Sequence, residues 1–223
     1  MDVFDALFQA PILPTVMPMA AERLCGFCEV LHQEGYLALE VLGRPLDAAL
    51  TAVAQAMRQP QRAKVNWGIG TLRTRDDARR AVALGPDFVV SPAFSRNVLD
   101  VAAEAGIAYI PGVLTFQDVQ DVIDAFGERD VPVKILKLCP VYGLTPEYVM
   151  SLRGCFPGIN FCPTGEITLD NYIQWKQIPG IAAPMGSELV PHEWITSGDL
   201  QRVRARLQLL RSMMEQAAAG LRA

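Results

Sequence analysis

The chain alternates short apolar runs with amphipathic segments along most of its length. Each apolar run is five to eight residues long, which is the length of a strand rather than of a helix. Most runs are apolar throughout, as expected for parallel strands that are buried on both faces. The eight predicted strands are Ile12–Met17, Leu37–Leu42, Ala63–Gly70, Phe88–Pro92, Ala108–Val113, Val133–Leu138, Asn160–Thr164 and Ile181–Gly186.

Between these runs, apolar residues recur at helical spacing, and capping residues mark where helices begin. Leu24, Phe27 and Leu31 share one face of a helix by their three- and four-residue spacing. Thr74 is a typical cap, and Thr145-Pro146 combines a cap with proline at the first helical position. The predicted helices are Asp2–Gln9, Ala20–Glu34, Thr74–Leu84, Thr145–Arg153, Thr168–Lys176 and Ser197–Glu215.

Strands that alternate with helices predict a parallel sheet. Eight such units in 223 residues predict a closed (β/α)8 barrel, the TIM barrel, with an open doubly wound sheet as the alternative fold. We expect one domain over residues 1–223, with an extra N-terminal helix (1–10), the barrel (12–190) and a C-terminal helix (197–218). Chemistry in this fold takes place at the C-terminal ends of the strands, so polar residues there are the candidates.

Composition and charge narrow the classes of function. A net charge of −4 argues against a nucleic-acid partner or an anionic membrane, because both need a dense positive field. The N-terminus lacks the pattern of a signal peptide, and no stretch has the length of a membrane span. Five irregularly spaced cysteines predict free thiols in the cytoplasm. Two distant histidines are too few for a His-rich metal site.

Two lysines interrupt one apolar strand. Side chains alternate between faces, so Lys134 and Lys137 point to opposite sides of the strand. We predict that Lys137, near the C-terminal end, points into the barrel, while Lys134 reaches solvent at the other rim. Burial disfavours the ammonium form, and a neutral amine is a nucleophile for a carbonyl carbon. The alternative is that Lys137 only pairs with a carboxylate.

A carboxylate interrupts a second strand. Glu40 lies within the run Leu37–Leu42, and Arg44 follows where the strand ends. A carboxylate inside a barrel is costly unless it is hydrogen-bonded or close to a cation, and Lys137 and Arg44 are the candidate cations. The functional interpretation is a proton shuttle, Glu40, beside an anion clamp, Arg44. The alternative is a buried Glu40–Arg44 pair with a structural role only.

The remaining candidates lie where other strands end. Gly68-Ile69-Gly70-Thr71 lacks the third glycine of a dinucleotide fingerprint and predicts a tight exit that places the Thr71 hydroxyl at the barrel mouth. Ser91-Pro92 and Pro111-Gly112, each taken alone, predict ordinary turns. Loops after the seventh and eighth strands of this fold commonly bind phosphate through backbone N–H groups. In this chain those loops contain Thr164, Gly165, Gly186 and Ser187.

In their order and spacing these segments resemble one family, the 2-keto-3-deoxy-6-phosphogluconate (KDPG) and 4-hydroxy-2-oxoglutarate (KHG) aldolases, class I enzymes on a (β/α)8 barrel. The resemblance runs from about Ile12 to about Val190. It is carried by Leu39-Glu40-Val41 with Arg44, Gly68-x-Gly70-Thr71, Ser91-Pro92, Ile110-Pro111-Gly112, Leu136-Lys137-Leu138-Cys139-Pro140 and Pro163-Thr164-Gly165.

The resemblance implies that Lys137 forms a Schiff base, that Glu40 is the general acid and base, and that Arg44 with Thr71 binds the pyruvate carboxylate. It implies cleavage of a 2-keto-3-deoxy sugar acid or a 4-hydroxy-2-oxo acid to pyruvate and an aldehyde, without a metal or an organic cofactor. It also implies a homotrimer. The further substrate contacts that it implies are Pro92, Gly112, Thr164, Gly165, Gly186 and Ser187.

Three segments depart from family members that take phosphorylated substrates. Glu166 follows Gly165 where those members usually have a second glycine, and Pro184–Glu188 replaces a glycine-rich segment. Met17 stands where many members carry an arginine. These changes bring one or two carboxylates to the expected phosphate site and remove a cation from it. We therefore hypothesise a substrate that is not phosphorylated, or one with a polar or cationic distal end.

Two other classes of function compete with an aldolase. A non-catalytic trimeric relative could bind a sugar acid or serve as a scaffold, but the joint presence of Lys137, Glu40 and Arg44 argues against it. A phosphosugar isomerase or epimerase would need paired acid and base residues at other strand ends and an intact phosphate cradle. The sequence contains neither.

Overall fold

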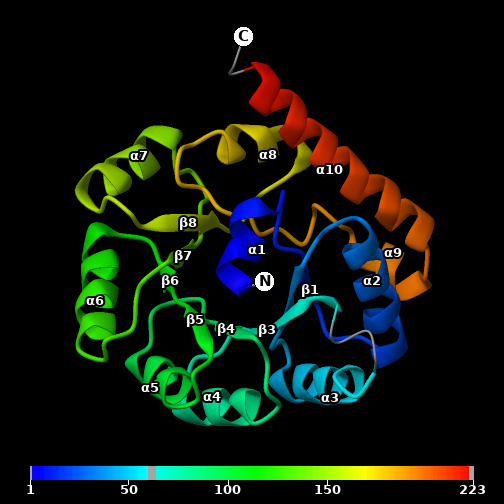
Figure 1. Ribbon diagram of the computed structural model, residues 1–223, viewed down its shortest axis with the longest axis horizontal. Helices are drawn as coiled ribbons and strands as arrows, with labels where there is room; N and C mark the ends of the chain where they lie inside the picture. The colour runs from blue at the N-terminus through cyan, green and yellow to red at the C-terminus, as the bar shows by residue number, and fades with distance from the viewer. Residues whose placement is uncertain (1, 60–63, 221–223) are drawn as a thin grey trace.

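Parallel strands surrounded by helices make up the molecule (Figure 1). The computed structural model describes residues 2–59 and 64–220, so Ala63, in the predicted third strand, lies outside the described residues. One sheet has the order β1-β2-β3-β4-β5 and the other the order β6-β7-β8, with every pair parallel. The strands are β1 (Thr15–Val16), β2 (Ala38–Leu42), β3 (Asn66–Gly70), β4 (Phe88–Val90), β5 (Ala108–Ile110), β6 (Gly112–Val113), β7 (Ile135–Leu138) and β8 (Asn160–Pro163).

The helices form a ring around the strands, except α1, which lies across the centre of the ring (Figure 1). They are α1 (Val3–Gln9), α2 (Ala21–Gln33), α3 (Leu46–Ala56), α4 (Arg75–Val82), α5 (Arg96–Glu104), α6 (Phe116–Gly127), α7 (Pro146–Cys155), α8 (Leu169–Lys176), α9 (His192–Ser197) and α10 (Leu200–Gly220). The predicted start of the C-terminal helix at Ser197 is wrong. Gly198, with φ of 82°, ends α9, and α10 begins two residues later. Within the described part of the chain, no helix is long and apolar enough to cross a membrane.

The predicted fifth strand joins the two sheets. Its first half is β5, which pairs with β4, and its second half is β6, which pairs with β7. Pro111 lies between the halves and has no N–H to donate to a continuous ladder. Its carbonyl oxygen instead accepts a hydrogen bond from the backbone N–H of Lys137 at 2.9 Å. The β-structure therefore continues from one sheet to the other through this segment.

The predicted eighth strand, Ile181–Gly186, is wrong as a regular strand but correct in position. It makes isolated bridges to Phe161, to Thr164 and, on its other side, to Leu13. Pro184 cannot donate a ladder hydrogen bond, although its carbonyl oxygen accepts one from the Leu13 N–H at 3.0 Å. These bridges place the segment between β8 and the residues before β1, where the last strand of a (β/α)8 barrel lies.

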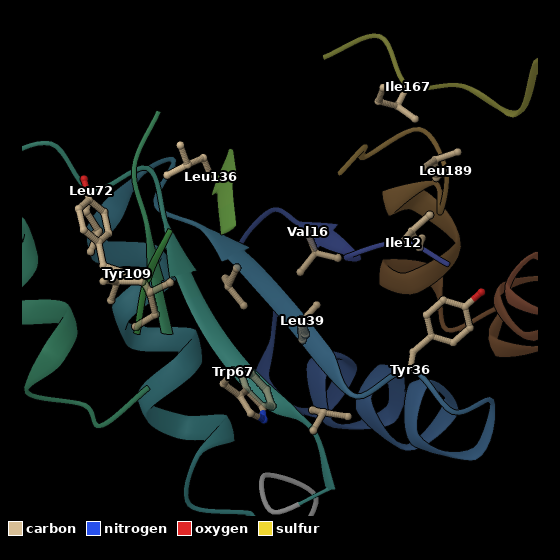
Figure 2. Close-up of a cluster of buried hydrophobic side chains, with 14 of the residues drawn as sticks. Ile12, Val16, Tyr36, Leu39, Trp67, Leu72, Tyr109, Leu136, Ile167 and Leu189 are labelled. Carbon is tan, nitrogen blue, oxygen red and sulfur yellow. The ribbon is translucent and has the colours of Figure 1, made fainter. Parts of the chain in front are cut away.

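Apolar side chains pack in two separate clusters because strand residues alternate in direction. The outer cluster lies between strands and helices, and Figure 2 shows Leu39 of β2, Trp67 of β3 and Leu136 of β7 within it. The inner cluster contains alternate residues of the same strands, such as Ala38 and Ile135. It also contains Val3, Leu7 and Ala10. Helix α1 therefore closes the end of the barrel at which the strands begin, and the opposite end stays open.

A lysine links helix α1 to the barrel at this closed end. Lys176, the last residue of α8, donates hydrogen bonds from Nζ to the carbonyl oxygen of Ala10 at 3.0 Å and to that of Ala182. Ala10 follows α1, and Ala182 belongs to the eighth barrel segment. Burial lowers the pKa of Lys176 from its ordinary value of 10.5 to about 8.

This lowered pKa predicts a dependence of stability on pH. Between pH 8 and pH 10.5 the unfolded chain binds more protons at Lys176 than the folded chain does, so the contribution of Lys176 to stability rises with pH across that window. We expect the free energy of unfolding of the wild type to gain on the order of 3 kcal/mol relative to Lys176→Met over this range. Urea denaturation of both proteins at a series of pH values measures the difference. Curves of unfolding free energy against pH that run parallel for the two proteins would contradict the prediction.

Candidate active site

Lys137 lies inside the barrel, as predicted. Its neighbour two residues earlier, Ile135, belongs to the inner apolar cluster, whereas Leu136 and Leu138 belong to the outer one. Lys137 is 6% exposed. Lys134, in contrast, lies at the rim near the start of β7, where its Nζ pairs with an Asp2 carboxylate oxygen at 3.0 Å. The alternation of the strand therefore separates one enclosed amine from one solvated amine.

Glu40 is the partner of this enclosed amine. Its side chain is fully buried, and its Oε1 lies 3.8 Å from the Nζ of Lys137. The hydroxyl of Thr15, on the neighbouring strand β1, donates to its Oε2 at 3.2 Å. Among the described residues, Glu40 makes no ion pair with Arg44, and its Oε1 accepts no hydrogen bond. One carboxylate oxygen is thus held in place, while the other faces the lysine and needs a partner.

Two glycines of β3 leave space for the side chains of Phe88 and Glu40. Their neighbours Trp67 and Ile69 belong to the outer cluster, so Gly68 and Gly70 face the inside of the barrel. A Cβ on Gly68 would lie 2.2 Å from the ring of Phe88, and one on Gly70 would lie 1.8 Å from Glu40 Oε1. Gly70 therefore provides the space in which the carboxylate sits, while Gly68 provides the space for the ring of Phe88.

A cavity of about 380 Å³ opens above this pair. It lies at the open end of the barrel, because its lining comes from the ends of the strands and the loops that follow them. The predicted site residues that line it are Arg44, Thr71, Pro92, Lys137, Thr164, Gly165, Gly186 and Ser187. Gly112 and the fully buried Glu40 are absent from this lining. A Cβ on Gly112 would lie 2.1 Å from the carbonyl oxygen of Pro92, so this glycine allows two chain segments to approach closely.

The comparison with known protein families agrees with this geometry. The sequence model of a family described as "KDPG and KHG aldolase" matches residues 3–206. The chain belongs to this family. Its members are class I aldolases, which cleave a 2-keto acid to pyruvate and an aldehyde through a Schiff base, so the chain is a carbon–carbon lyase. The aldolase is therefore supported over the non-catalytic scaffold.

Individual relatives of this aldolase are similar over nearly their whole length. The 2-dehydro-3-deoxy-phosphogluconate aldolase of Treponema pallidum is 32% identical over 92% of this chain and 94% of its own. The KHG/KDPG aldolase of Escherichia coli is 26% identical over 88% and 89%. The crystal structure of the KDPG aldolase of Legionella pneumophila, with pyruvate captured as a covalent carbinolamine, has a TM-score of 0.80 at 25% identity and covers 93% of this chain and 97% of its own. The fold of the aldolase is therefore the predicted TIM barrel.

Sequence reasoning missed Thr15, which lines the cavity of the aldolase and binds Glu40. Its signal in the sequence is weak: it is the single hydroxyl residue in the apolar run Ile12–Met17. The sequence also left open the directions of Glu166 and Glu188. Both are exposed, and both line the cavity. The outer wall of the active site therefore carries two carboxylates.

A cysteine also lines the cavity: Cys139 follows β7, two residues after Lys137. Burial raises the pKa of the Cys139 thiol, the positive charge of Lys137 opposes that rise, and the Glu40 carboxylate adds to it. The thiol is therefore protonated at neutral pH and is a poor nucleophile. This leaves the amine of Lys137 as the candidate nucleophile in this part of the cavity.

Proposed function

We propose that Lys137 is the nucleophile of this aldolase and that Glu40 is its general acid and base. One observation carries the proposal: the Nζ of Lys137 lies 3.8 Å from Glu40 Oε1 in a buried site that borders the cavity. A carboxylate at this distance can exchange a proton with the amine or with a bound substrate. The carbinolamine captured in the Legionella pneumophila structure supports the same chemistry for this family.

In the first stage, the Lys137 ammonium gives a proton to the Glu40 carboxylate, and the amine then attacks the C2 ketone of the substrate and forms a carbinolamine. Glu40 passes a proton to the carbinolamine hydroxyl, which leaves as water, and the C2–N bond becomes an iminium. The iminium is an electron sink, and this is the reason for covalent catalysis in this reaction.

In the second stage, the bond between C3 and C4 breaks. The C4 hydroxyl gives its proton to the Glu40 carboxylate, the C3–C4 electron pair moves toward the iminium nitrogen, and an aldehyde leaves. The resulting enamine takes a proton at C3. Water then hydrolyses the iminium, which releases pyruvate and restores the free amine of Lys137.

Arg44 and Thr71 are proposed to bind the carboxylate of the substrate. Arg44 is exposed within the cavity lining, and a guanidinium can form two parallel hydrogen bonds with a carboxylate. Thr71 has a φ of 64°, a strained conformation for a β-branched residue, and such strain clusters at functional sites. The other proposed substrate contacts are Pro92, Thr164, Gly165, Gly186 and Ser187. Gly112 is proposed to act indirectly, by allowing the close approach of Pro92.

We also propose that the enzyme is a homotrimer, as the family resemblance implies, and that it works in the cytoplasm, as its free cysteines indicate. Phe116 of α6 and Met150 of α7 are exposed by 38% and 57%, and Phe116 stacks edge-on against Tyr148 of α7. This exposed apolar surface on neighbouring helices supports an interface between subunits. Light scattering during size-exclusion chromatography measures the mass in solution.

Reduction with borohydride tests the proposed chemistry. Incubation of the protein with pyruvate and sodium borohydride should inactivate it irreversibly, because the reagent reduces the iminium to a stable secondary amine. Peptide mass spectrometry should place the added group on Lys137. Lactate has no ketone and serves as the matched control. A protein that stays unmodified in the presence of pyruvate would instead support a non-catalytic binding protein.

A further inference from the structure

The catalytic cavity has one reacting end and one solvent end, and the two ends differ in charge. At the reacting end, the buried Lys137 faces the Oε1 of Glu40, which accepts no hydrogen bond from the described residues. Among the exposed charged residues of the described lining, Arg44 is the cation, while Glu166 and Glu188 are carboxylates. A substrate in the cavity therefore meets one exposed positive charge and two exposed negative ones.

The single exposed cation limits how many anionic groups a substrate can present. Every 2-keto acid has a carboxylate next to its reacting ketone, and the proposed function assigns Arg44 to that carboxylate. The distal end of the substrate then faces the wall that contains Glu166 and Glu188. A phosphate or a second carboxylate at this end would be repelled by both side chains, which only accept hydrogen bonds when they are ionised.

Hydroxyl groups also line the cavity. Tyr142, 58% exposed, and Ser187, also exposed, reach its solvent end, and the half-buried Thr164 lies between the two ends. These hydroxyls both donate and accept hydrogen bonds, and the carboxylates accept them from the hydroxyls of a ligand. Such a wall suits a chain of uncharged hydroxyl groups.

Resting on the proposed function, we infer that the preferred substrate is a 2-keto-3-deoxy sugar acid whose distal end is uncharged and hydroxylated. Arg44 binds its single carboxylate, Lys137 attacks its ketone, and Glu166 and Glu188 accept hydrogen bonds from its distal hydroxyls. This chain therefore differs in substrate from relatives that are named for a phosphogluconate, such as the aldolase of Treponema pallidum.

Steady-state kinetics with three substrates test this inference. We expect kcat/KM for 2-keto-3-deoxygluconate to exceed the values for its 6-phosphate and for 4-hydroxy-2-oxoglutarate. Glu166→Gln and Glu188→Gln should each narrow that preference by about 2- to 5-fold, because each exposed carboxylate contributes a modest interaction. A higher salt concentration should also reduce the substrate preference of the wild type, since exposed charges are screened.

The matched control is Glu104→Gln, which makes the same change of charge in an exposed residue at the end of α5, where the chain returns to the closed end of the barrel. It should leave the preference unchanged. Two results would overturn the inference in a protein that still traps pyruvate on Lys137. One is a higher kcat/KM for either substrate with two anionic groups, and the other is a substrate preference that neither glutamine variant alters. Failure to trap pyruvate would overturn the proposed function itself.

Discussion

Replacing Lys137 with methionine should reduce aldol cleavage by at least about 10⁴-fold, because no Schiff base can form without the amine. Methionine has a similar length and tolerates an apolar environment, so it should occupy the enclosed position left by a lysine that is only 6% exposed. Cleavage is followed by coupling pyruvate release to lactate dehydrogenase. Trapping with borohydride should fall to background in the same variant.

Lys134→Met is the matched control for this experiment. It makes the same substitution three residues away in a side chain that is solvated and pairs with Asp2, so activity should remain close to that of the wild type. Circular dichroism and urea denaturation should show that both variants fold. A Lys137→Met protein that is folded and still gives a pyruvate adduct would show that a different amine is the nucleophile.

Replacing Gly70 with alanine should lower kcat by about 10²- to 10³-fold, within the range of about 10²- to 10⁴-fold that general acid–base catalysis contributes. The added Cβ would lie 1.8 Å from Glu40 Oε1 and 2.7 Å from its Cδ, so the carboxylate must move away from its position 3.8 Å from Lys137 Nζ. The variant retains Lys137 and Arg44, so KM should change much less than kcat. Measuring both constants separates loss of proton transfer from loss of binding.

Two further variants show whether Gly70 acts through Glu40. Gly127→Ala adds the same methyl group where nothing lies within 4 Å, and it should leave kcat unchanged. In a Glu40→Ala background there is no carboxylate to displace, so adding Gly70→Ala should cost almost nothing more. Fully additive losses in the double variant would contradict the steric explanation.

The parts of the fold that follow from local pattern could be predicted from the sequence. Two-residue alternation placed Lys137 and Lys134 on opposite faces of one strand, and the inner and outer clusters confirm that placement. Capping residues marked α4 and α7 within two residues of their observed starts and ends. The prediction of where strands end also led to eight of the seventeen described residues that line the cavity.

The parts that depend on a neighbouring strand or helix could not be predicted in the same way. The bond from Thr15 to Glu40 follows from the register of β1 against β2, which no pattern within either strand reveals. The steric role of Gly70 depends on the carboxylate of Glu40, thirty residues earlier in the chain. The eighth strand has the composition of a strand, but Pro184 restricts it to isolated bridges.

The reacting pair and the two exposed carboxylates belong to different kinds of backbone. Lys137 and Glu40 project from strands whose register holds them, whereas Glu166 and Glu188 lie on the connections that follow the later strands. Connections accept replacement more readily than strands do. If Lys137 and Glu40 cleave the bond as proposed, we expect a directed library confined to residues 165–167 and 186–188 to change which aldehyde is released without abolishing bond cleavage.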